Sequence, residues 1–302
     1  MKTIIDWCGF RVRDTVQNVK EALIVAIQCE NLGVDFLDLG RGVNGFQSSF
    51  AILVGGVQAG IVAFGGSFQR GWISVSLTGV GCGFVRDWVH LQRVCSRLPG
   101  FEFRRVDIAL DITDGKTRYE DAFNAYLAGG FNGSGRRPKH KQVLGEIEDG
   151  RTLYVGVRKG SDKFLRVYEK GRQLAGGRGS VTHINGVPVE DWLRVEVEFK
   201  AQTGPIPPDI IDCRDQYFAG SYPWLSSLLD GVEAFSWRFS PKLHAQLELQ
   251  KALANIRAQY GDTLHTALEA FDGDMCRLFA QISSGEHNKK LVQAGVLSLE
   301  HL

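Results

Sequence analysis

The sequence has no apolar run long enough to span a membrane, and its N-terminus is strand-like and interrupted by polar residues rather than a signal peptide. Its six cysteines form no CxxC pair, which argues against both a zinc site and a disulfide framework. We therefore expect a cytoplasmic protein without a membrane partner. Bulk basicity is also missing, because the formal net charge of the 302 residues is +1. This counts mildly against a nucleic-acid partner, although a local stripe of Lys and Arg can hold phosphates while acidic residues elsewhere cancel the total.

Three segments in the middle of the chain alternate apolar with polar residues, which is the pattern of a strand with one buried face. They are RRVDIALDITDG (104–115), KFLRVYEKGRQ (163–173) and DWLRVEVEFKA (191–201). If these strands are neighbours in one sheet, their polar sides form one surface with four carboxylates, several cations and a phenol. The members of this surface are Asp107, Asp111, Arg166, Tyr168, Lys170, Arg194, Glu196, Glu198 and Lys200. This is more charge than a structural sheet usually collects on one face, and the pattern by itself fits a chemical site and a merely solvated polar face equally well.

The rest of the first 200 residues predicts an α+β fold, with an antiparallel or mixed sheet and packed helices. Strands are expected at 3–13, 34–39, 49–54, 61–64, 72–77, 152–158 and 164–170, the last two as a hairpin. Helices are expected at 16–31, 84–98 and 119–127, and Thr15 is the expected N-cap of the first. The glycine run GVGCG (79–83) fits neither phosphate-loop pattern, so no nucleotide site is expected there.

A boundary is expected at TGPIPP (203–208), which holds three of the eight prolines. We expect an α+β catalytic region at 1–203, with two α/β subunits split near residue 100 as one option, and an all-α C-terminal domain at 210–302. Its helices are predicted near 222–229 and at 241–260, 263–271 and 275–282. Ser240 and Asp262 are the expected N-caps of the second and third of these helices.

The run TLYVGVRKGSDKFLRVYEKG (152–171), with RVDIALD (105–111) upstream and WLRVEVEF (192–199) downstream, resembles the Rep-trans family, the replication initiation factors of rolling-circle plasmids and filamentous phages. The segments IIDWCGFRV (4–12) and SLTGVGCGFV (76–85) are similar to the phage-type members. The resemblance implies an enzyme in the cytoplasm of a bacterial host cell that nicks one DNA strand at a replication origin through a tyrosine, with a divalent metal, and rejoins it. It also implies a host helicase and a single-strand-binding protein as partners, and it leaves a homodimer open.

Transfer of a phosphodiester to an enzyme hydroxyl needs a nucleophile, a cation to offset charge on the phosphoryl oxygens and groups that orient the phosphate. With the resemblance, Tyr168 is the predicted nucleophile and Tyr154 the second choice. Arg166 and Lys170, two residues either side of Tyr168, are expected to hold the phosphate and to lower the pKa of the phenol.

The predicted cofactor is Mg²⁺ or Mn²⁺, because carboxylates suit hard cations. Asp107 and Glu196 are the expected ligands, with Asp111 and Glu198 in reserve. Other tyrosine nickases bind metal through a His-hydrophobic-His pair, which none of the seven histidines forms; in the resembling family carboxylates take that place. Gln173 stands where that family often has an acidic residue, so a second carboxylate role just after the tyrosine is in doubt.

The densest cationic cluster lies in FNGSGRRPKHKQ (131–142) and is either a solvated loop or an arm against DNA phosphates. The candidate DNA-binding residues are Arg136, Arg137, Lys139 and Lys141 in this cluster, together with Arg194. A surface ion pair of Arg194 with Glu196 is the alternative for that arginine. Two other functions stay open: a non-catalytic sequence-specific DNA-binding regulator, in which Tyr168 only packs, and a metal-dependent hydrolytic nuclease, which needs the carboxylates but forms no protein–DNA adduct.

Overall fold

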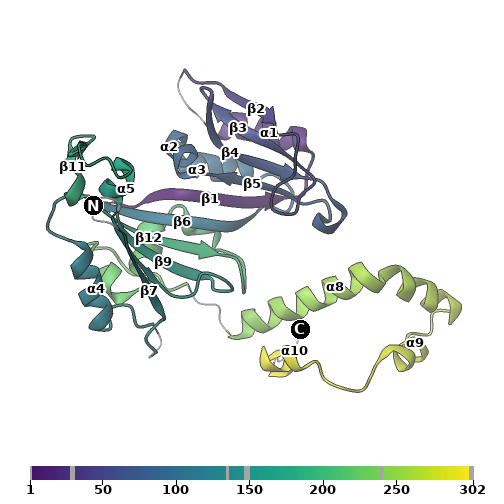
Figure 1. Ribbon diagram of the computed structural model, residues 1–302. Helices are drawn as coiled ribbons and strands as arrows, with labels where there is room; N and C mark the ends of the chain where they lie inside the picture. The colour runs from purple at the N-terminus through teal and green to yellow at the C-terminus, as the bar shows by residue number, and fades with distance from the viewer. Residues whose placement is uncertain (1, 28–30, 134–135, 146–149, 238–240, 299–302) are drawn as a thin grey trace. The chain divides into compact units, whose positions relative to one another are not determined.

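The computed structural model describes residues 2–27, 31–133, 136–145, 150–237 and 241–298. The chain forms two compact units, Met1–Trp237 and Arg238–Leu302 (Figure 1). Within the described ranges, no helix is both long enough and apolar enough to cross a membrane.

The first unit is built on a ten-stranded sheet in the order β2-β3-β4-β5-β1-β6-β12-β9-β8-β7. The strands are β1 (Ile4–Val12), β2 (Val34–Asp38), β3 (Ser48–Val54), β4 (Val57–Phe64), β5 (Ile73–Leu77), β6 (Glu102–Ile112), β7 (His140–Leu144), β8 (Arg151–Val155), β9 (Lys163–Glu169) and β12 (Leu193–Lys200). Neighbouring strands are antiparallel throughout. Two short strands, β10 (His183–Ile184) and β11 (Val187–Pro188), pair separately. The predicted α+β fold with an antiparallel sheet is confirmed.

The three alternating segments become β6, β9 and β12, with β12 in the middle (Figure 1). Val195 of β12 pairs with Leu110 of β6 on one side and with Val167 of β9 on the other. All three side chains are fully buried. Because side chains alternate across a strand, this register places the apolar members of the three strands on one face and the polar members on the other. The prediction that these strands share a sheet and a polar face is confirmed.

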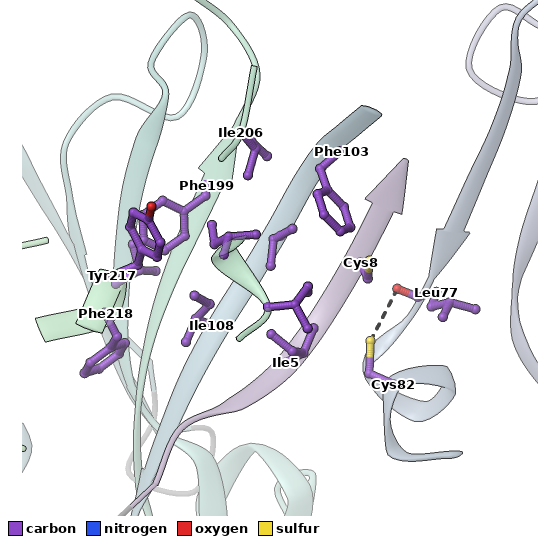
Figure 2. Packing of buried hydrophobic residues seen from close by; sticks show 14 of the residues in the cluster. Ile5, Cys8, Leu77, Cys82, Phe103, Ile108, Phe199, Ile206, Tyr217 and Phe218 are labelled. Atoms are coloured by element: carbon purple, nitrogen blue, oxygen red, sulfur yellow. Dashed lines mark hydrogen bonds between the residues drawn. The ribbon is translucent and has the colours of Figure 1, made fainter. Parts of the chain in front are cut away.

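The apolar face is covered by a segment beyond the proline-rich TGPIPP stretch. Figure 2 shows Ile108 of β6 and Phe199 of β12 facing Tyr217 and Phe218 of α6 (Arg214–Ala219), a helix that the sequence pattern did not predict. Phe199 and Phe218 are at most 1% exposed, and burial of one such side chain contributes about 1.5–3 kcal/mol. Another short helix, α7 (Pro223–Ser226), places Leu225 in the same core. Residues from 210 to 237 therefore belong to the first compact unit rather than to the second.

The described part of the first unit also holds the helices α1 (Val16–Ala26), α2 (Gly79–Phe84), α3 (Trp88–Cys95), α4 (Tyr119–Leu127) and α5 (Lys170–Ala175). Thr15 caps α1 as predicted, because its side chain accepts a hydrogen bond from the Asn18 backbone N–H. Helix α1 ends earlier than predicted, and residues 28–30 lie outside the described ranges. The short 3₁₀ segments of this unit are η1 (Ser67–Gln69), η2 (Val189–Asp191) and η3 (Pro208–Ile210).

The prediction of one helix over 84–98 is wrong, since the glycine run itself forms α2 and Asp87 begins a new helix as the N-cap of α3. Glycine is required within α2 because the helix lies directly on β4. A Cβ on Gly81 would come 1.8 Å from the carbonyl oxygen of Ala59, which no side chain tolerates.

The second unit is helical, as predicted, with α8 (Pro241–Ala270), α9 (Met275–Ile282), α10 (Lys289–Gln293) and the 3₁₀ segment η4 (Val296–Ser298). The predicted break near Gly261 is wrong, because α8 continues through it and Asp262 lies inside the helix. An interior glycine costs a helix only about 1 kcal/mol relative to alanine, which a helix of 30 residues can absorb. The predicted bounds of α9 are confirmed, while the predicted N-cap Ser240 lies outside the described residues.

Candidate active site

The polar face of β6, β12 and β9 brings together the side chains that the sequence pattern placed on one surface. Arg194 of β12 stands opposite Asp111 on one side and Tyr168 on the other, and two residues further along Glu196 stands opposite Arg166. Glu198 stands opposite Asp107. This row of paired positions is the candidate site.

Burial separates this face from a solvated sheet surface. Five members are almost inaccessible: Asp107 is 2% exposed, Tyr168 3%, Glu198 4%, Glu196 5% and Arg194 6%. The alternative of a merely solvated polar face is therefore wrong. Buried charged groups persist only when they are paired, and the pairing at this face is accordingly dense.

Tyr168 lies in a triangle with Glu196 and Arg166. Its phenol donates to Glu196 Oε2 at 3.4 Å, while Arg166 Nη2 donates to the same oxygen at 2.6 Å and lies 3.5 Å from the phenol oxygen. The Arg166 guanidinium also covers the Tyr168 ring, 4.4 Å from its centroid. The phenol is thus presented to a carboxylate that can accept its proton, beside a cation that can accompany a phosphate.

The predicted lowering of the phenol pKa by neighbouring cations is wrong for the free protein. Burial, and next the negative charge of Glu196, raise the pKa of Tyr168, and they outweigh the opposite effect of Arg166 and Arg194. The phenol is therefore neutral before DNA binds.

Lys170 reaches the site by a different route from the one predicted. It is not a strand residue but the first residue of α5, which begins where β9 ends. Its ammonium still lies 5.7 Å from the centroid of the Tyr168 ring. The start of the helix, rather than strand alternation, places this cation beside the phenol.

Asp107 and Glu198 are bridged by an arginine that had not been selected from the sequence. Arg105 donates to both oxygens of Asp107, at 2.8 and 2.5 Å, and lies 2.9 Å from Glu198 Oε2. Arg105 has the same strand parity as Asp107, so alternation alone could have identified it. Glu198 has two more cationic partners, Arg158 and Lys200, each at 2.9 Å.

The pKa values of the two bridged carboxyl groups are shifted in opposite directions. Burial raises the pKa of Asp107 to about 7, and the charges of Glu196 and Glu198 act in the same direction against Arg105. Burial would also raise the pKa of Glu198, but hydrogen bonds from Arg158 and Lys200 and the charge of Arg105 lower it overall.

Arg194 is held between two carboxylates. It donates to both oxygens of Asp111 at 2.6 Å and to Asp6 Oδ1 at 2.7 Å, so the alternative of a surface pair with Glu196 is wrong. Trp192 Nε1 donates to the same Asp111 at 2.8 Å. Sequence reasoning missed Asp6, because a bulge between Ile5 and Trp7 shifts the register of β1 there.

The donor chemistry at Asp107, Glu196 and Glu198 fits a divalent cation, since carboxylate oxygens are what Mg²⁺ and Mn²⁺ prefer. The side-chain positions do not yet form a site. Within the described ranges, no group of three or more His, Cys, Asp or Glu side chains is placed to hold a metal ion. The Arg105 guanidinium lies against Asp107 and Glu198, and its side chain, 28% exposed, would have to turn away before a cation could bind there.

Two members of the cationic cluster contact neighbouring elements, one at the end of α4 and one in the sheet. Arg137 donates to the carbonyl oxygen of Leu127 at 2.7 Å, and Lys141 lies on the edge strand β7 opposite Tyr154 of β8. Tyr154 in turn stands opposite Arg166, so Lys141 and Tyr154 share the polar face with the candidate site. Tyr154, the second choice of nucleophile, stacks on Phe164 with ring centroids 5.7 Å apart. Arg136 and Lys139 are exposed.

Two comparisons with known proteins identify relatives of this chain. The family model for replication initiation factors matches residues 101–278, more than half of the chain, and this range contains β6, β9 and β12. A solved rolling circle replication initiator protein from Geobacillus stearothermophilus has a similar fold, with a TM-score of 0.54 and 22% identity over 73% of this chain and 85% of that chain. A search of curated proteins found no match. The extent of the family match shows that this chain belongs to the Rep-trans family of replication initiation factors.

Proposed function

We propose that this protein starts rolling-circle replication by nicking and rejoining one DNA strand at an origin through Tyr168. The observation that carries the proposal is the triangle of Tyr168, Glu196 and Arg166, buried beside Asp107 and Glu198 in a chain of the replication-initiator family. A buried tyrosine that merely packs also needs a hydrogen-bond partner, but it would not need the additional buried carboxylates Asp107 and Glu198 on the same face.

In the proposed reaction, the Tyr168 oxygen attacks the scissile phosphorus and the bond from phosphorus to the 3′ oxygen breaks. Glu196 accepts the phenol proton as the new bond forms, and the departing 3′ oxygen takes a proton from solvent water to become a hydroxyl. The products are a 5′-phosphotyrosine and a free 3′ hydroxyl. Because the phosphodiester energy is kept in the tyrosine link, the 3′ hydroxyl can attack it later and reseal the strand without ATP.

Arg166 and Lys170 are the proposed phosphate-binding groups. Arg166 offers a planar fork that matches phosphate oxygens, and it already lies within 3.5 Å of the phenol oxygen. The phenol of the free protein is neutral. It therefore has to transfer its proton to Glu196 when the phosphate is bound and attacked.

Asp107 and Glu196 are the proposed ligands of Mg²⁺ or Mn²⁺, which would offset negative charge on the phosphoryl oxygens when bound. Within the part of the chain that is described, Glu196 Oε1 takes no hydrogen bond, since Arg166 and Tyr168 both use Oε2. Glu198 is the next candidate. Asp111 is the least suited, because Arg194 and Trp192 occupy its oxygens.

DNA is the proposed partner, and Lys141, Lys139, Arg136 and Arg137 are the proposed contacts to phosphates outside the cut. Lys141 shares the polar face with the site, so a strand crossing β7 and β8 would lead to Tyr168. Arg194 has both of its carboxylate partners inside the protein and is proposed to position the site rather than to contact DNA directly. The host helicase and the single-strand-binding protein remain proposed partners.

The decisive experiment is capture of the covalent intermediate. Full-length protein is incubated with Mn²⁺ or Mg²⁺ and end-labelled single-stranded oligonucleotides that tile the DNA flanking its gene, and the products are separated on a denaturing gel. We expect an adduct with the wild type and with Tyr154→Phe, the matched control, and none with Tyr168→Phe. A normal yield of adduct from Tyr168→Phe would eliminate Tyr168 and favour Tyr154. Cleavage without any adduct would favour the hydrolytic nuclease, and sequence-specific binding without cleavage would favour the regulator.

A further inference from the structure

A cleft of about 660 Å³ opens beside the candidate site, inside the first unit. Its walls come from the start of β1, from α2 and from the start of α5. The lining includes Lys170, Arg194 and Arg214 as cations and Asp6 as a carboxylate. Trp88 and Trp192 add aromatic surface, and both are only partly buried. The volume lies within the range of about 300–1,000 Å³ that is usual for ligand pockets.

Two of the three cations in this cleft have no carboxylate partner among the residues that the structure describes. Among the described residues, the Lys170 ammonium has only the amide oxygen of Gln173 as hydrogen-bond partner, at 3.1 Å. Within the same described ranges, the Arg214 guanidinium donates only to the backbone carbonyl oxygens of Thr3 and Ile211, at 3.1 and 3.2 Å. By contrast, Arg194 is neutralised by two carboxylates, Asp6 and Asp111.

Partly buried cations without counter-charges favour an anion supplied from outside the protein. Burial, and next the positive charge of Arg194, lower the pKa of Lys170, so a bound anion would also hold this lysine in its charged form. The ammonium lies 5.7 Å from the Tyr168 ring centroid, which places one end of the cleft at the proposed nucleophile. The expected ligand therefore carries negative charge, reaches the nucleophile and offers a flat face to aromatic side chains.

We propose that this cleft binds the single-stranded DNA that flanks the scissile phosphate, with Lys170 and Arg214 on successive stretches of its backbone and an unpaired base against the tryptophan surface. Single-strand sites in general combine a cationic groove with aromatic side chains on which bases stack. This assignment rests on the proposed function for the position of the scissile phosphate. It is otherwise independent, because binding of the strand requires no chemistry at Tyr168.

The test measures the affinity of the full-length protein for fluorescein-labelled oligothymidylate by anisotropy, with EDTA present so that no metal-dependent cleavage occurs. Arg214→Gln removes a cleft cation and keeps most of the side-chain volume. Each phosphate contact contributes about −0.7 to the slope of log affinity against log salt for single strands. If Arg214→Gln loses one phosphate contact, the ratio of wild-type to variant affinity should fall about 2.6-fold between 50 and 200 mM salt. Arg41→Gln, an exposed arginine of the same unit outside the cleft, should keep the wild-type slope.

A second variant blocks the cleft without changing charge. Gly83 lines the cleft, is exposed and has open space where a Cβ would stand. Because leucine is a better helix former than glycine, Gly83→Leu should fold at least as well as the wild type while narrowing the cleft. We expect it to weaken oligothymidylate binding at every salt concentration, with an unchanged melting temperature or a higher one.

Wild-type affinity and slope in both Arg214→Gln and Gly83→Leu would overturn the assignment of the cleft, even if Tyr168 forms the adduct. Weakened binding in both variants, in a protein that forms no adduct with any oligonucleotide, would instead leave the cleft as a DNA site and overturn the proposed nicking function. The two ideas therefore fail separately.

Discussion

Asp107→Asn should remove a pH dependence of stability that the wild type carries in its first unit. The pKa of Asp107 is raised from 3.8 to about 7 in the folded protein, so the folded state holds this proton more tightly than the unfolded state does. The stabilisation that Asp107 contributes is therefore fully present below about pH 4 and is lost as the pH rises toward 7, because the unfolded state loses its proton first. At 1.36 kcal/mol per pKa unit, the full loss is about 4 kcal/mol, which is an upper figure for one carboxyl beside Arg105.

Asparagine has a similar shape and does not titrate, so this pH-dependent contribution should be absent from the variant. Urea unfolding followed by tryptophan fluorescence at several pH values between 4 and 8 is the suitable assay, because all six tryptophans lie within Met1–Trp237. The difference in unfolding free energy between variant and wild type should grow by up to about 4 kcal/mol from pH 4 to pH 8 in favour of asparagine.

Asp35→Asn, which changes an exposed carboxylate of the same unit, is the matched control and should follow the wild type at every pH. If the Asp107→Asn curve also runs parallel to that of the wild type, the argument that burial dominates the titration of Asp107 is refuted. A steeper decline in the variant than in the wild type would refute it equally.

Three further predictions concern the site and the sheet. Glu196→Gln should abolish adduct formation, because it removes the proposed proton acceptor. It should also destabilise the protein by about 1–3 kcal/mol, because it leaves Arg166 with a neutral partner. Full adduct yield in this variant would contradict the role of Glu196. Removal of divalent metal with EDTA, or Asp107→Ala, should stop nicking while oligothymidylate binding persists, and metal-independent nicking would remove the case for a cofactor. Gly81→Ala should destabilise the first unit by about 1–3 kcal/mol or more, because its Cβ would meet the Ala59 carbonyl oxygen. Gly83→Ala on the same helix should instead stabilise the unit by up to about 1 kcal/mol. Equal melting temperatures for the two variants would show that α2 does not lie against β4 as described.

Local pattern was sufficient for the parts of this protein whose geometry is set by the backbone itself. Strand alternation identified β6, β9 and β12 and the side of each strand on which Asp107, Tyr168 and Glu196 stand, because a period of two is a property of any pleated strand. Thr15 could be recognised as a cap for the same reason, since it acts on its own helix within three residues. Arg105 lay within reach of this reasoning, as it shares the parity of Asp107.

Other features depended on contacts between residues far apart in the chain. Asp6 joins the site through a bulge formed against β6, and α6 belongs to the first unit because it covers the apolar face of the sheet. The direction of the Tyr168 pKa shift was also decided by the fold. From sequence, the adjacent cations dominate, but packing removes water from the phenol and brings Glu196 to it from another strand. Pairing partners and the loss of solvent exist only once the sheet has formed, so the sequence determined which groups share a face, and tertiary structure alone decided how they are charged and what they contact.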